Sequence, residues 1–62
     1  MNSHAAELSS IVSQLDDLVK RLDGMSTGYV GGDREDIATR LIEVERSLAT
    51  AARRLSVLQR TL

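Results

Sequence analysis

The sequence predicts an all-α fold, an antiparallel hairpin of two helices over about residues 3–23 and 34–62 with a loop over 24–33. The chain contains no proline, and residues with high helix propensity dominate it. Large apolar residues recur at alternating intervals of three and four in two segments, as on one face of a helix. Three of the four glycines lie together between these segments. The 62 residues suffice for one small domain, 1–62.

The first helix carries a regular apolar seam along one side. Its seam residues are spaced by three and four in turn: Leu8, Ile11, Leu15, Leu18, Leu22 and Met25. Val12 and Val19 directly follow seam positions and widen the apolar stripe, which suits a helix that touches two neighbours. We expect Gly24 to follow the end of the helix, because glycine readily adopts the left-handed backbone conformation found there.

The second helix repeats the pattern over almost four heptads without interruption. Its seam residues are Ile37, Leu41, Val44, Leu48, Ala51, Leu55, Leu58 and Leu62. Asp33 is the expected N-cap, since an aspartate side chain accepts hydrogen bonds from the first backbone N–H groups of a helix. Ala38 and Ala52 lie beside the seam, where small side chains allow another backbone to approach closely.

The connecting stretch from Met25 to Asp33 places glycines immediately before a helix, which is also a feature of phosphate-binding loops. Here three acidic residues around the helix start would repel an anion, and the lysine of such loops is absent. We therefore interpret the stretch as a turn. Tyr29 and Val30 are its apolar residues. We expect them to plug the end of the bundle against Met25 and Ile37, with docking onto a partner as the alternative.

Unequal helix lengths predict that the hairpin associates with another chain. At about 1.5 Å per residue, the two predicted helices are roughly 31 and 43 Å long. Leu55, Leu58 and Leu62 would then extend beyond the first helix, and a row of exposed leucines is unfavourable. A homodimer or tetramer, in the form of a four-helix bundle or coiled coil, would cover them. The expected interface residues are Leu8, Val12, Val19, Ala51, Ala52, Leu55, Leu58 and Leu62.

The sequence lacks the residues that most catalytic and metal sites need. No cysteine is present and His4 is the only histidine, so neither disulfides nor a zinc site is expected. The adjacent carboxylates of Asp16 and Asp17 point about 100° apart on a helix and do not converge. We expect no cofactor, no metal and no enzymatic activity. No apolar run reaches the roughly 18 residues of a membrane span, and no secretory signal is recognisable, which favours a cytoplasmic location.

The functional class that these patterns favour is a non-enzymatic protein–protein interaction module. It would act as a homo-oligomeric scaffold, adaptor or regulator that binds a larger protein through its apolar seam. The alternative is a small nucleic-acid-associated protein. Arg46, Arg53 and Arg60 recur every seven residues on the second helix and offer a basic row for phosphates. The net charge of −1 and the lack of an aromatic residue in this row favour the first class.

Overall fold

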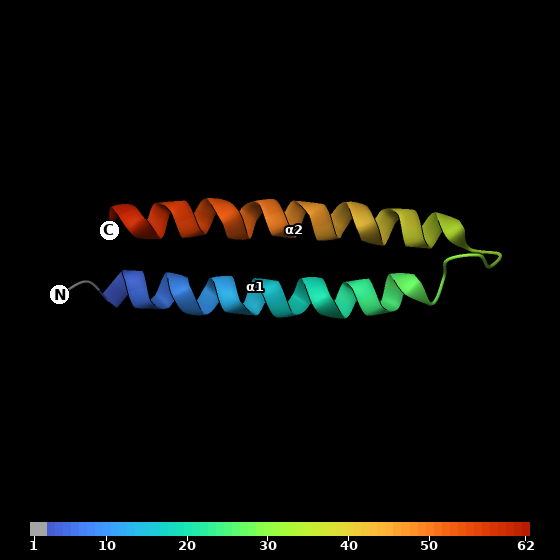
Figure 1. Ribbon diagram of the computed structural model, residues 1–62, viewed down its shortest axis with the longest axis horizontal. Helices are drawn as coiled ribbons and strands as arrows, with labels where there is room; N and C mark the ends of the chain where they lie inside the picture. Colours follow the sequence, from blue (N-terminus) through green and yellow to red (C-terminus); the bar gives the residue numbers. More distant parts are fainter. Residues whose placement is uncertain (1–2) are drawn as a thin grey trace.

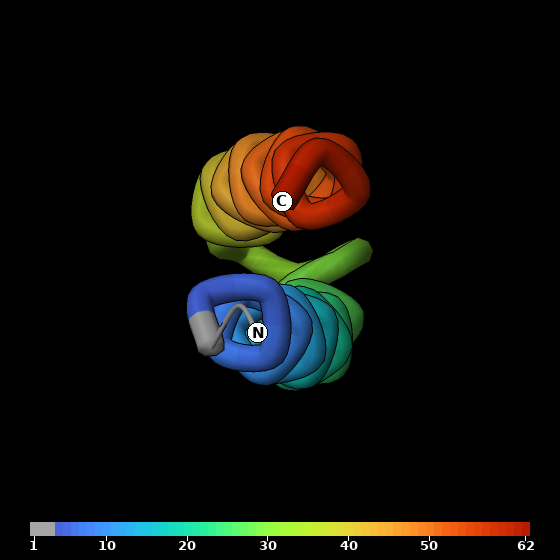
Figure 2. Tube along the Cα trace, turned by 90° about the vertical axis from the view of Figure 1, so that its left-hand side faces the viewer, coloured from blue at the N-terminus to red at the C-terminus, as the bar shows by residue number. Residues whose placement is uncertain are grey.

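The computed structural model describes residues 3–62, which form two helices and one turn. Helix α1 spans Ser3–Thr27 and helix α2 spans Glu35–Thr61. The helices run antiparallel and side by side, with the turn at one end and the C-terminus beside the start of α1 at the other (Figure 1). Seen along their axes, they form a single layer (Figure 2). The predicted all-α hairpin is confirmed, and the described part of the chain contains no strand.

The two helices contact each other through one row of side chains from each, which we call the contact rows. These rows advance by three and four residues in turn, as expected for helices that pack along their length. They consist of Ala5, Leu8, Val12, Leu15, Val19, Leu22 and Ser26 of α1, and Ala38, Leu41, Glu45, Leu48, Ala52, Leu55 and Gln59 of α2. Among residues 4–62, the only apolar side chains that are buried are Ala38 and Ala52.

The contact rows keep every second residue of the predicted seam and differ from it at the residues between, where the contact-row residue comes one position later. The sequence pattern places Ile11, Leu18 and Met25 in the seam, but their side chains are exposed. Val12 and Val19 lie at the contact with α2 instead. On α1, the row of Val12 and Val19 lies beside the row of Ile11 and Leu18, and the hairpin covers only the first. On α2, the two buried apolar residues are the small Ala38 and Ala52.

Helix α1 continues to Thr27, four residues beyond the predicted end. Gly24 therefore lies inside the helix, and its expected role as a stop was wrong. A glycine destabilises a helix interior by about 1 kcal/mol relative to alanine. The turn of helix that follows Gly24 nevertheless contacts α2, because Ser26 is only 3% exposed and its hydroxyl lies 3.4 Å from the Glu45 carboxylate. The hydroxyls of Ser26 and Thr27 each donate a hydrogen bond of 2.9 Å to the Asp23 carbonyl, which supports the last turn.

The longer α1 removes the predicted mismatch between the helices. Helix α1 has 25 residues and α2 has 27, so each accompanies the other over nearly its whole length. Leu62 lies beside the first turns of α1, where it lines a hollow together with His4 and Leu8. Leu55 is half-buried in the contact row, and Leu58 is exposed at its side. The expected overhang of the C-terminal leucines beyond α1 is therefore wrong.

Residues 28–34 connect the helices by a compact turn. The backbone N–H groups of the first three turn residues donate to carbonyls three residues back, which tightens the chain as it leaves α1. Gly31 has a φ of 81°, a left-handed conformation that glycine adopts without strain. The Gly31 N–H donates a 2.8 Å hydrogen bond to the carboxylate of Glu35 at the start of α2. This bond ties the turn to the second helix.

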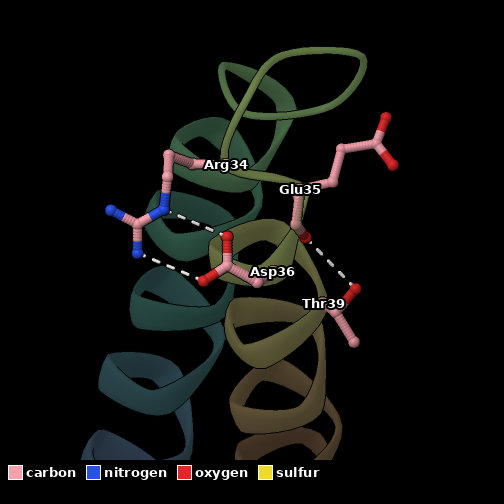
Figure 3. Close-up of polar contacts among 4 residues, drawn as sticks. All are labelled: Arg34, Glu35, Asp36 and Thr39. Carbon is pink, nitrogen blue, oxygen red and sulfur yellow. Dashed lines mark hydrogen bonds and ion pairs between the residues drawn. The ribbon is translucent and has the colours of Figure 1, made fainter.

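Arg34, and not Asp33, is the N-cap of α2, and its side chain makes no capping hydrogen bond. The predicted cap was wrong because the helix begins at Glu35, one residue later than expected. The Arg34 guanidinium instead donates two hydrogen bonds of 3.1 Å to Asp36, and the Thr39 hydroxyl donates to the Glu35 carbonyl (Figure 3). The bond from Arg34 lowers the pKa of the exposed Asp36 carboxyl. Two carboxylates in the first turn also complement the helix dipole.

Replacing Gly24 with alanine should stabilise the hairpin, because a Cβ at this position meets no atom within 4 Å. We expect Gly24→Ala to raise the free energy of unfolding by about 0.5–1 kcal/mol in urea titrations followed by circular dichroism. Gly31→Ala is the matched control, since its left-handed backbone makes alanine destabilising there. A loss of stability in Gly24→Ala would show that the helix does end before this glycine.

Candidate interaction surface

A row of apolar side chains lies next to the contact row on each helix. Its residues come one position before a contact-row residue and recur every seven positions along each helix. Two antiparallel helices lying side by side are related by a two-fold axis perpendicular to their common plane, so equivalent positions point to the same side. We call the resulting surface the outer apolar face: Ile11, Leu18 and Met25 from α1, and Ile37, Val44, Ala51 and Leu58 from α2.

The outer apolar face differs in polarity from the opposite side of the hairpin. The equivalent rows on that side, which come one position after a contact-row residue, contain Ser9, Asp16 and Asp23 of α1, and Ile42, Ala49 and Ser56 of α2. Two of these six residues are aliphatic, two are serines and two are acidic, whereas no residue of the outer apolar face is charged. Contiguous apolar surface rimmed by polar residues is typical of an interaction site.

The outer apolar face continues into a hollow at the open end of the hairpin. The hollow has a volume of about 220 Å³ and is lined by His4, Glu7, Leu8, Ile11 and Leu62. Cofactor and ligand pockets usually enclose roughly 300–1,000 Å³. The hollow is therefore small for a cofactor, and its size suits one or two apolar side chains of a protein partner.

The eight predicted interface residues occupy two different environments. Five of them lie in the contact rows, where the opposite helix of the same hairpin already covers them in part: Leu8, Val12, Val19, Ala52 and Leu55. Ala51, Leu58 and Leu62 are exposed at the side or the end of the hairpin. Only these three therefore present most of their side-chain surface outside the hairpin.

Four exposed residues of the outer apolar face are absent from the interface that the sequence predicts. Ile11, Leu18, Met25 and Val44 are assigned by the sequence pattern to the seam inside the hairpin. Their seven-residue spacing within each helix is visible in the sequence. Which of two adjacent rows faces the other helix depends on how the two helices pack together, and the spacing alone does not determine that packing.

Tyr29 and Val30 lie on the turn, at the opposite end of the hairpin from the C-terminus (Figure 1). Tyr29 is 38% exposed and Val30 is 66% exposed. Of the two residues expected beneath them, Met25 is itself exposed and Ile37 is half-buried. Whether this pair plugs the end of a bundle or docks onto a partner stays a prediction.

The arginine row lies along the surface of α2, outside the contact with α1. Arg46, Arg53 and Arg60 are all exposed, and the ion pair between Arg34 and Asp36 involves none of them. Helix α2 contains no aromatic residue, so nucleic-acid bases would find no ring to stack on. The row can contact phosphates, or it can be an ordinary solvated surface of a helix.

A polar contact between the helices lies near the turn, where Ser26 of α1 faces Glu45 of α2. The Ser26 hydroxyl lies 3.4 Å from the Glu45 carboxylate. Burial raises the pKa of the Glu45 carboxyl above its ordinary value, and the neighbouring Asp23 carboxylate raises it further. The hydrogen bond from Ser26 opposes part of this rise. An ionised Glu45 therefore destabilises the contact between the two helices.

The described residues offer no arrangement typical of a metal or catalytic site. Within residues 3–62, no group of three histidine, cysteine, aspartate or glutamate side chains could hold a metal ion. Ser26 lies beside a carboxylate, but it is buried and donates to a backbone carbonyl, so a substrate has no access to its hydroxyl. In the same part of the chain, neither helix is long and apolar enough to cross a membrane.

Comparison with known proteins does not assign the chain to a family. No protein-family model matches it, no curated protein matches it, and no solved structure matches it. Functional inference therefore depends on the surfaces of the hairpin itself.

Replacing Glu45 with glutamine should stabilise the hairpin at neutral pH. A carboxyl whose pKa is raised by folding contributes its full stability below its ordinary pKa and loses it as the pH rises through the raised value. We therefore expect Glu45→Gln to raise the melting temperature at about pH 7, with the gain vanishing at about pH 3. The exposed Glu43 provides a control, because Glu43→Gln changes the net charge equally. Equal gains in both variants would attribute the effect to net charge alone.

Proposed function

We propose that the protein is a small non-enzymatic protein–protein interaction module that acts as a scaffold, adaptor or regulator. The outer apolar face is the surface that another protein chain covers. The hairpin extends over 52 Å and is only one helix thick, so its exposed rows run along much of its length. Such a shape presents a large surface for a chain of 62 residues.

The exposure of large apolar side chains on the outer apolar face carries this proposal. Leu18, Val44 and Leu58 are 41%, 47% and 49% exposed. Fully burying a leucine or valine side chain contributes about 1.5–3 kcal/mol. The exposed side chains of the isolated hairpin obtain only part of this free energy of burial. Covering the face with a partner would contribute the rest.

The spacing of the face favours a helical protein as the partner. Its residues recur every seven positions on two antiparallel helices. Apolar residues of an amphipathic helix recur at the same interval, so partner side chains can insert between those of the hairpin. A small molecule would find only the shallow hollow beside Leu62, which supports a protein partner over a cofactor or substrate.

A photo-crosslinking amino acid at Leu58 should capture a protein partner in cells that make this chain. The matched control carries the same label at Val57, the neighbouring exposed residue, which lies outside the outer apolar face. We expect adducts from position 58 and few from position 57, and the adducts should disappear when Val44→Lys is added. The absence of adducts from position 58, or equal labelling from both positions, would refute the proposal.

The exposed and unpaired arginine row supports association with nucleic acid as a second candidate function. In that case the chain binds DNA or RNA at low salt, and the affinity falls steeply as salt increases. The double variant Arg53→Ala and Arg60→Ala should then lose at least tenfold in affinity, measured by fluorescence anisotropy with labelled duplex and single-stranded oligonucleotides. Binding that is absent at low salt, or unaffected by this variant, would eliminate the candidate.

A further inference from the structure

We infer that the chain covering the outer apolar face is a second copy of this protein, so that two hairpins stack into a four-helix dimer. The inference rests on the proposed function, because it names the partner of the same surface. It differs from the dimer that the sequence predicts in the residues that form the interface. The contact rows stay within each hairpin, and the two outer apolar faces meet each other.

The accessible surface of the hairpin is larger than that of a typical folded monomer of its mass. The chain exposes 4807 Å² for a mass of 6.8 kDa, whereas the usual scaling with mass gives about 4,000 Å². The excess is about 800 Å², which matches the area that each partner buries in an interface of standard size. Stacking a second copy on the hairpin would bury an area of this size.

A single hairpin does not enclose a core. Its principal extents are 52 × 14 × 9 Å, and no side chain among residues 4–62 is fully buried. The buried apolar residues, Ala38 and Ala52, are small and contribute little apolar area. A second layer over the outer apolar face would place Leu18, Val44 and Leu58 between two pairs of helices, which is the arrangement of a four-helix bundle.

The outer apolar face is suited to contact a copy of itself. Both helices contribute a row of uncharged apolar residues, so a two-fold axis can place each row of one copy against a row of the other. Helix α1 carries four acidic and two basic residues, a balance of −2, and α2 carries four acidic and five basic residues, a balance of +1. When α1 of one copy packs on α2 of the other, helices of opposite net charge become neighbours.

Sedimentation equilibrium of the purified chain tests this inference, with Val44→Lys and Ile42→Lys as matched variants. Both variants replace an exposed β-branched residue of α2, but Val44 lies on the outer apolar face and Ile42 lies on the opposite side. We expect the wild type and Ile42→Lys to sediment at twice the chain mass of 6.8 kDa. Val44→Lys should increase the dissociation constant of the dimer at least tenfold.

Thermal unfolding of the wild type provides a second measurement that does not require the variants to fold. If folding is coupled to association, the melting temperature rises with protein concentration. A wild-type mass of one chain, a melting temperature independent of concentration, or equal dissociation in both variants would overturn the inference. A mass above two chains would overturn it as well.

The two proposals fail in different ways. A monomeric wild type whose label at position 58 still captures a larger protein would overturn the dimer and leave the proposed function standing. A monomeric wild type with no adduct at position 58 would refute both. A dimer that Val44→Lys dissociates would support both, because the covering chain is then a protein and also a second copy.

Discussion

The packing of α1 against α2 through two narrow contact rows determines which surfaces the molecule presents. A helix pair can bury one stripe from each partner, and the two buried apolar residues of that stripe, Ala38 and Ala52, are small. Once these rows face each other, the neighbouring apolar rows must lie at the side of the hairpin. The outer apolar face is therefore a geometric consequence of the contact that forms the fold.

The distribution of polarity between these rows is unusual for a lone folded unit. The contact rows include Ser26, Glu45 and Gln59, while Leu18 and Leu58 lie outside. Glu45 and Gln59 stay partly exposed and the Ser26 hydroxyl donates to the Asp23 carbonyl, so the hairpin tolerates these polar groups at modest cost. For large apolar side chains, the free energy of burial is greatest where two layers of helices enclose them. Leu18 and Leu58 therefore bury less of their surface in the hairpin than the six leucines of the contact rows do.

The all-α hairpin was predictable because it depends on properties local to the sequence. The intervals of three and four, the absence of proline and the glycines between the segments each act over one or two turns. Gly24 shows where local reasoning fails: the helix continues past it to Thr27, and Ser26 in that extension contacts Glu45 of α2, a residue distant in sequence. The choice between adjacent apolar rows fails for the same reason, since it depends on how the two helices pack together.

The short turn also bears on the order in which the molecule assembles. Residues 28–34 close a small loop, which carries little entropic cost, so contacts nearest the turn can form before those at the open end. The contact between Ser26 and Glu45 lies at this end and joins residues only 19 positions apart. Burial and the Asp23 carboxylate raise the pKa of Glu45, so a drop in pH that protonates Glu45 favours the hairpin at its turn end, through one side chain.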